Sequence, residues 1–120
     1  MWTQIKRINQ RAIWSWAGFL HVWRTEGSLH QWIWANVFFV VLAFVLPLDW
    51  GVRGALLMGG IMVLAMECVN TAIERVVDDI STDIRDAARH AKDAGSAAVA
   101  VTAIGVGVGW VCAIIGVVMG

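Results

Sequence analysis

Hydrophobic and polar positions are strongly segregated along this chain. Three stretches contain no Asp, Glu, Lys or Arg: 27–48, 54–66 and 94–120. About 20 consecutive apolar residues make a helix long enough to cross the hydrocarbon core of a bilayer, which is roughly 30 Å thick. The pattern therefore predicts three membrane-spanning helices, at 28–48, 54–73 and 94–120. Only a tight turn around Asp49–Gly51 separates the first two, so we expect them to form a helical hairpin.

Two amphipathic segments accompany the spans. Apolar residues recur at spacings of three or four within 1–26, at Ile5, Ile8, Ala12, Trp16, Phe19 and Trp23. This spacing is typical of a helix that lies in the membrane interface. The segment 74–93 repeats the pattern at Val77, Ile80, Ile84, Ala88 and Ala91, and Ser81 and Thr82 could cap a new helix or turn there. We expect one all-α membrane domain over residues 1–120.

Composition supports this fold class and fixes an orientation. Only 15% of the residues are charged, against about 25% in soluble domains, which excludes a soluble nucleotide-binding α/β enzyme. A net charge of zero gives no indication of a nucleic-acid partner. Lys and Arg gather before the first span and after the second, whereas the turn between them has Arg53 alone. The positive-inside rule then places the N-terminus and segment 74–93 in the cytoplasm and the C-terminus outside.

The most informative polar residues lie at the end of the second span. Glu67, Asn70, Glu74 and Asp78 have helical spacing that places them within about 80° of one helix face. A carboxylate within a membrane costs a few kcal/mol and indicates function, although Glu67 could simply pair with an Arg to fix the bundle. Carboxylates and phosphate oxygens together bind Mg²⁺, and a deeper carboxylate can act as a base. Glu26, just before the first span, could add a ligand.

A second polar cluster opens the third span at Lys92, Asp93, Gly95 and Ser96. Lys92 and Ser96 share a helix face near an expected helix N-terminus, where free amides and the helix dipole favour anions such as phosphate. The alternative is that Lys92 and Asp93 are ordinary surface charges. The chain has no Walker sequence GxxxxGK[ST], so a bound nucleotide would need an unusual site.

Two runs of sequence carry a family resemblance. The run ECVNTAIERVVD at 67–78 and the run AKDAGSAA at 91–98 closely resemble the prokaryotic diacylglycerol kinase family, as do Trp14-Ser-Trp-x-Gly18 and Trp23-x-x-Glu26. The resemblance implies a homotrimeric helical bundle in the bacterial inner membrane, with active sites between subunits. It also implies transfer of the ATP γ-phosphate to diacylglycerol with Mg²⁺, giving phosphatidic acid for phospholipid synthesis or recycling.

The same resemblance assigns roles to residues. It makes Glu67 the general base that takes the lipid hydroxyl proton, and Glu26 and Glu74 the ligands of divalent ions. The residues implied to bind ATP are Arg7, Trp14, Glu26, Glu74, Asp83, Arg85, Lys92 and Asp93. Those implied to position the lipid and the base are Arg11, Ser15, Trp16, Trp23, Glu67, Asn70 and Ser96.

The chain departs from the family pattern in places. Trp32 stands where the diacylglycerol branch typically has an acidic residue, which puts that residue's contacts in doubt. Residues 70–78 look like the undecaprenol kinase branch and residues 92–96 like the diacylglycerol branch, so both lipids stay open and diacylglycerol is favoured. A small transporter or membrane scaffold is the non-enzymatic alternative. It would explain Glu67 but not the alignment of Glu74 and Asp78 with it.

Overall fold

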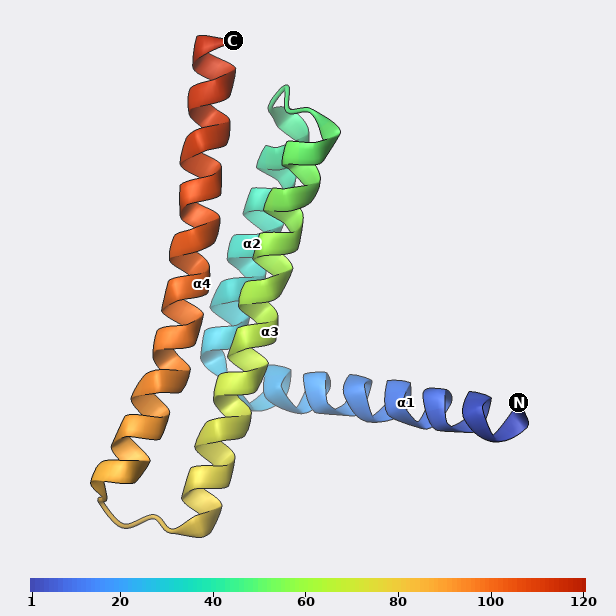
Figure 1. The fold of residues 1–120 in the computed structure, drawn as a ribbon, viewed down its shortest axis with the longest axis vertical. Coiled ribbons are helices and arrows are strands. Elements are labelled where there is room, and N and C mark those ends of the chain that lie inside the picture. The colour runs from blue at the N-terminus through green and yellow to red at the C-terminus, as the bar shows by residue number, and fades with distance from the viewer.

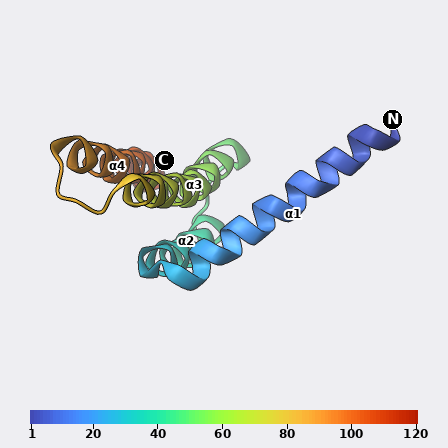
Figure 2. The ribbon, with the colours of Figure 1, turned by 90° about the horizontal axis from the view of Figure 1, so that it is seen from below.

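The computed structural model describes all 120 residues and contains four helices and no strands, with 90% of the chain helical. The helices are α1 (Trp2–Thr25), α2 (Gly27–Val45), α3 (Trp50–Ile80) and α4 (Asp86–Met119). Helices α2, α3 and α4 run alongside one another, and α1 projects sideways from the bundle (Figure 1). The view from below shows that α1 leaves the bundle at the start of α2 (Figure 2). The all-α fold with a separate N-terminal helix is confirmed.

The surface of the chain is that of a membrane protein. Helices α2, α3 and α4 are each long and apolar enough to cross a bilayer. The accessible surface is 8636 Å², whereas a compact soluble protein of this mass exposes about 6,400 Å². Large apolar side chains such as Phe38, Phe44 and Ile104 are more than half exposed. Lipid must therefore cover much of this surface.

The turn between α2 and α3 follows from local sequence. Pro47 has no backbone N–H and disfavours helical backbone at the residue before it. Leu46 is accordingly extended, with φ −75° and ψ 145°, and α2 ends at Val45 rather than at residue 48 as the sequence predicted. Helix α3 then begins at once because Asp49 Oδ1 accepts a hydrogen bond from the Val52 N–H at 2.9 Å.

At the polar end of the bundle, the helices extend past the predicted ends of the membrane spans. Helix α3 continues without interruption to Ile80, and α4 begins at Asp86, well before residue 94. The amphipathic segment 74–93 is divided by the loop 81–85, where Ser81 and Thr82 predicted a new helix or turn, and Ile84 in this loop is fully exposed. Ser81 supports this loop by accepting a hydrogen bond from the Asp83 N–H at 3.1 Å. Neither Ser81 nor Thr82 caps α4, whose N-cap residue is Arg85.

Helix α3 is the central element and packs against α1, α2 and α4. Two adjacent glycines allow the close approach of its neighbours. A Cβ at Gly59 would lie 2.8 Å from Cγ2 of Val106 on α4, and a Cβ at Gly60 would collide with Asn36 on α2. Asn36 also donates to the Gly60 carbonyl at 3.1 Å. These contacts set how α2 and α4 align along α3.

The three spans differ greatly in length. At 1.5 Å per residue, α2 is about 28 Å long, α3 about 46 Å and α4 about 51 Å. The C-terminus lies beside the α2–α3 turn. At the other end of the bundle, α3 and α4 extend past α1 (Figure 1). The polar ends of α3 and α4 therefore project beyond the part of the bundle that α2 spans.

Candidate active site

Exposure increases along the predicted row of polar residues on α3. Glu67 is only 6% exposed, Asn70 and Glu74 are half-buried, and Asp78 is exposed. The row runs toward the end of the bundle that projects past α1 (Figure 1). The sequence predicted this order, with a deep carboxylate below two that are open to water.

The carboxylate of Glu67 is held by α2. Its Oε1 accepts a hydrogen bond from Trp32 Nε1 at 2.8 Å, and its Oε2 accepts one from Ser28 Oγ at 3.3 Å. Both donors lie in the first two turns of α2, so the start of that helix holds the carboxylate. Glu67 forms no salt bridge. The alternative in which Glu67 pairs with an Arg is therefore wrong.

Asn70 and Glu74 form a hydrogen-bonded pair beside α4. Asn70 Nδ2 donates to Glu74 Oε1 at 3.3 Å. Asn70 Oδ1 is buried without a hydrogen-bond partner and lies directly against Gly95, where a Cβ would collide with it. Gly95 thus makes room for the Asn70 amide. Ser96, the next residue, is exposed on α4.

A cavity of about 310 Å³ lies where α3 and α4 are joined. Its lining includes four of the residues that the family resemblance assigns to ATP: Asp83, Arg85, Lys92 and Asp93. Asp78 also lines it and accepts a hydrogen bond from Lys92 Nζ at 2.6 Å. Because α4 begins at Asp86, Lys92 belongs to its second turn. The predicted role of helix N-terminal amides beside Lys92 is therefore wrong, and side-chain charge remains the attraction for anions.

Glu26 lies in the elbow between α1 and α2, where its backbone is extended. Arg75 of α3 contacts three side chains there: Glu26 Oε1 at 3.1 Å, Thr25 Oγ1 at 2.9 Å and His21 Nε2 at 3.0 Å. These contacts attach the elbow to α3, one residue after Glu74. No group of three or more His, Cys, Asp or Glu side chains gathers anywhere in the chain. Carboxylates that lie apart do not form a dedicated metal cage. They are suited to Mg²⁺ that is also bound by phosphate oxygens.

The residues predicted on α1 lie apart from the α3–α4 cavity. Arg7, Arg11 and Trp14 surround an open hollow of about 310 Å³ on α1 itself. Helix α1 contacts α2 and α3 but not α4, and Arg7 lies about 27 Å from the elbow at Thr25. Within a single chain, the structure therefore does not bring Arg7 and Trp14 to Lys92.

The remaining lipid candidates are dispersed along α1. Ser15 lines a cavity of about 450 Å³ between α1 and α3, together with Phe19, Cys68 and Thr71. Trp16 is largely exposed. Trp23 instead stacks on His30, with ring centroids 3.7 Å apart, and stiffens the elbow. Ser15 thus lies near the α3 residues that follow Glu67, whereas the Glu67 carboxylate itself is hydrogen-bonded to α2.

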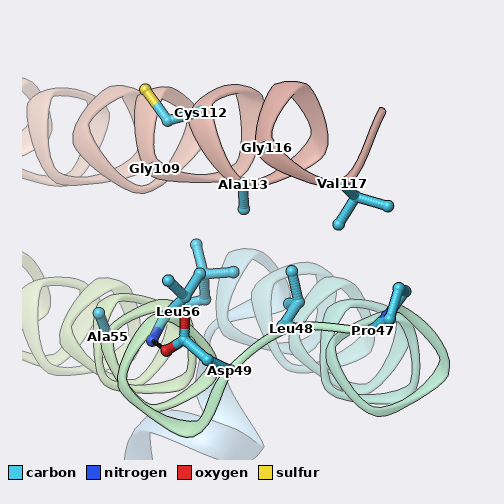
Figure 3. A pocket seen from close by; sticks show the side chains of 11 residues that line it. Pro47, Leu48, Asp49, Ala55, Leu56, Gly109, Cys112, Ala113, Gly116 and Val117 are labelled. Carbon is cyan, nitrogen blue, oxygen red and sulfur yellow. Dashed lines mark hydrogen bonds between the residues drawn. The ribbon is translucent and has the colours of Figure 1, made fainter. Parts of the chain in front are cut away.

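One further large cavity, of about 440 Å³, lies at the opposite end of the bundle (Figure 3). The turn after α2, the start of α3 and the end of α4 form its walls, including Pro47, Leu56, Cys112 and Val117 (Figure 3). Its only acidic residue is Asp49, which is occupied as the cap of α3. None of the predicted site residues lines this cavity.

The sequence interpretation missed three residues of the site. Ser28 and Trp32 were not assigned to Glu67, and Arg75 was not recognised as the residue that holds Glu26. One signal was present, because Ser28, Trp32 and Asn36 recur every four residues and so share one face of α2. All three donate hydrogen bonds to α3.

Three helices apolar enough to cross a membrane, with a row of polar side chains that becomes more exposed along α3, define a small integral membrane protein with a polar site at one end. The chain belongs to the prokaryotic diacylglycerol kinase family, whose sequence model matches residues 13–114. It is similar to the diacylglycerol kinase of Pseudomonas aeruginosa, with 34% identity over 95% of this chain and 93% of that protein. It is also similar to the diacylglycerol kinase of Escherichia coli, with 35% identity over 90% and 88%.

More distant relatives agree with this assignment. The diacylglycerol kinase of Helicobacter pylori is 31% identical over 78% of this chain and 73% of its own length. The chain is therefore a lipid kinase of the diacylglycerol kinase type, and the transporter and scaffold alternatives are set aside.

Proposed function

We propose that this chain transfers the γ-phosphate of ATP to the primary hydroxyl of diacylglycerol, giving phosphatidic acid. The observation that carries the proposal is the gradient of exposure along α3, from buried Glu67 to exposed Asp78. A lipid hydroxyl lies at the membrane surface and a nucleotide lies in water, so their reaction needs functional groups at both depths. The names of the relatives support diacylglycerol as the acceptor.

In this proposal Glu67 is the general base. Its carboxylate takes the proton of the lipid hydroxyl while the hydroxyl oxygen forms a bond to the γ-phosphorus. The bond between that phosphorus and the bridging oxygen breaks, and ADP leaves. The depth of Glu67, within the first two turns of α2, matches the level at which a glycerol hydroxyl lies. Phosphoryl transfer needs mainly positioning and neutralisation of charge, and requires little more covalent chemistry from the protein.

The cavity between α3 and α4 is the proposed nucleotide site. Lys92 and Arg85 supply positive charge to phosphate oxygens, and Asp83 and Asp93 complete the polar lining. Mg²⁺ would enter with ATP, and Glu26 and Glu74 are the carboxylates proposed to hold it. The Asn70 amide, which already donates to Glu74, keeps that carboxylate oriented.

We place the protein in the bacterial inner membrane as a multi-pass protein, with its active site in the cytoplasm. The basic residues near the span ends support this orientation, because they concentrate on α1 and around the α3–α4 loop. Helix α1 and that loop lie toward the same end of the bundle, and the C-terminus lies at the other (Figure 1). The C-terminus is then periplasmic.

We also propose a homotrimer whose subunits share active sites. Arg7, Trp14 and the surface around Arg11, Ser15 and Trp16 do not reach the α3–α4 cavity of their own chain. A neighbouring subunit's α1 would supply them if it crossed the bundle. The exposed apolar faces of the spans also leave room for subunit contacts.

Radiolabelled ATP, Mg²⁺ and purified protein in mixed micelles with diacylglycerol test the proposed reaction. We expect label in phosphatidic acid, and loss of that label when Mg²⁺ is chelated. A parallel sample with undecaprenol tests the other acceptor. Label in undecaprenyl phosphate alone would overturn diacylglycerol as the substrate, and no label in either lipid would overturn the kinase reaction.

A further inference from the structure

Helix α2 presents two hydrogen-bond donors to the two oxygens of one carboxylate. Trp32 contacts Oε1 of Glu67 and Ser28, one helical turn earlier, contacts Oε2. We propose that Trp32 is a positioning residue, which holds the Glu67 carboxylate in the orientation that accepts the proton of the lipid hydroxyl. This inference rests on the proposed function of Glu67 as the general base.

The Trp32 contact is the stronger of the two. Its length of 2.8 Å is typical of a hydrogen bond between an N–H group and a charged oxygen. The indole N–H is a donor only, so the oxygen it contacts must be the acceptor. The Ser28 contact is longer, at 3.3 Å, and a serine hydroxyl can donate or accept. Trp32 therefore fixes the orientation, and Ser28 restrains the second oxygen.

The backbone at Trp32 is itself attached to α3. Asn36 Nδ2 donates to the Trp32 carbonyl at 3.0 Å and to the Gly60 carbonyl at 3.1 Å. Gly60 has no Cβ, and one would collide with the Asn36 side chain. The indole thus projects from a point on α2 whose distance from α3 is fixed by this contact. Groups placed on helices and supported in this way hold a functional side chain more accurately than a loop does.

The arrangement leaves Glu67 able to react. An ionised carboxylate offers about four acceptor positions, and the two α2 donors occupy one on each oxygen. The remaining positions are free for the hydroxyl of the lipid. Because the indole has no acceptor, Trp32 cannot take that proton itself and acts only through Glu67.

Two replacements of Trp32 separate positioning from simple space filling. Trp32→Phe keeps an aromatic ring but removes the donor, whereas Trp32→Gln keeps an N–H donor but removes the ring. We expect Trp32→Phe to lower kcat by about 10- to 100-fold, the effect of misplacing a reacting group, with KM for ATP unchanged. Trp32→Gln should retain more activity than Trp32→Phe. The control is Trp34→Phe on the same helix, because Trp34 is 67% exposed and should retain wild-type kcat.

Two kinetic outcomes would overturn the positioning role. One is wild-type kcat in Trp32→Phe, and the other is higher activity in Trp32→Phe than in Trp32→Gln, because only packing would favour the ring over the donor.

An NMR measurement tests the contact without any use of activity. The eight tryptophans of indole-¹⁵N-labelled protein in micelles give separate N–H signals, and the Trp32 signal is the one missing from Trp32→Phe. We expect Glu67→Gln, which leaves Trp32 intact, to shift the Trp32 signal upfield because a neutral amide is the weaker acceptor. The Trp34 signal should stay in place.

The two measurements together distinguish the possible failures. An unshifted Trp32 signal in an active kinase would overturn this inference alone. If Glu67→Gln shifts the Trp32 signal but the wild-type protein phosphorylates no lipid, the proposed function is overturned, and the positioning role with it.

Discussion

Carboxylates in this protein differ in function because their surroundings differ. Asp49 is a helix cap, since its oxygen accepts from the first turn of α3. Asp78 is exposed and pairs with Lys92. Glu67 is buried, forms no salt bridge and accepts two hydrogen bonds from α2. Of these three carboxylates, only Glu67 is both buried and without an ion pair, which is the arrangement we expect of a proton acceptor.

Replacing Glu67 tests its role as the base. Glu67→Gln keeps the size of the side chain and an acceptor for Trp32, but it cannot take a proton from the lipid. We expect kcat to fall by about 100-fold or more, as general bases contribute 10²–10⁴-fold, while ATP still binds. Lipid phosphorylation and equilibrium binding of a labelled ATP analogue are the two measurements. Retained turnover would show that Glu67 is not the base.

Replacing Glu74 tests the proposed contact with Mg²⁺. Glu74→Gln removes a charged ligand, so we expect half-maximal activity to require a higher Mg²⁺ concentration. Asp79→Asn is the matched control, because Asp79 is an exposed acid on α3 outside the row. An Mg²⁺ titration of both variants measures the effect. If the two curves coincide with that of the wild type, Glu74 does not hold the ion.

Sequence spacing was sufficient to predict the row on α3 but not the partners of Glu67. The i, i+3, i+7 and i+11 pattern depends only on helix geometry, so the order of Glu67, Asn70, Glu74 and Asp78 was foreseeable. The contact with Trp32 depends on how α2 and α3 align, which the Asn36–Gly60 contact sets. Such a tertiary contact has no local signature, and Trp32 was interpreted only as a departure from the family pattern.

At the scale of elements, hydropathy predicted the number of helices but not where they end. The bilayer requires about 20 apolar residues in each span; the charge-free stretches 27–48 and 94–120 meet that requirement, and the second span meets it only by including Glu67 and Asn70. Helix ends are set instead by local chemistry: Pro47 stops α2, and the loop 81–85 separates α3 from α4. Nothing in the sequence interrupts α3 at residue 73 or α4 at residue 93, so both helices extend past the predicted span ends.

The packing of α3 against α4 makes a prediction about Gly59. A Cβ there would lie 2.8 Å from Val106, whose branched side chain has little rotational freedom in a helix. We expect Gly59→Ala to lose about 1 kcal/mol of unfolding free energy, because overpacking costs about 1–3 kcal/mol and alanine recovers about 1 kcal/mol of helix propensity.

Gly105→Ala is the matched control for this prediction, because nothing lies within 4 Å of a Cβ at Gly105. This variant should be as stable as the wild type or slightly more so. Denaturant unfolding in detergent micelles measures both variants. Equal stability of the two would contradict the close approach of α3 and α4 at Gly59.

At the scale of the whole molecule, one chain keeps the candidate residues on α1 apart from the α3–α4 cavity. Its radius of gyration is 17.9 Å, against about 13.6 Å for a compact domain of this length, because α1 extends away from the bundle (Figure 2). Arg7 and Trp14 therefore do not reach the α3–α4 cavity of their own chain. The family resemblance predicted shared sites, and the sequence without that resemblance gave no means to foresee which helix reaches which subunit.

Mixed subunits test the proposed sharing of sites. Arg7→Ala and Lys92→Ala should each be nearly inactive when purified alone, because every site of such a trimer lacks one of the two cations. When the two variants are unfolded together and reassembled, some sites combine an intact α1 with an intact cavity, so activity should return. A mixture as inactive as its components, or a monomeric mass in detergent, would contradict shared sites.

The central claim is that this membrane protein phosphorylates diacylglycerol by using ATP. A competition experiment tests it most directly: diacylglycerol and undecaprenol at equal concentrations in the same micelles, with labelled ATP, Mg²⁺ and the wild-type protein. We predict that most of the transferred label will appear in phosphatidic acid. Label mainly in undecaprenyl phosphate, or in neither lipid, would contradict the account.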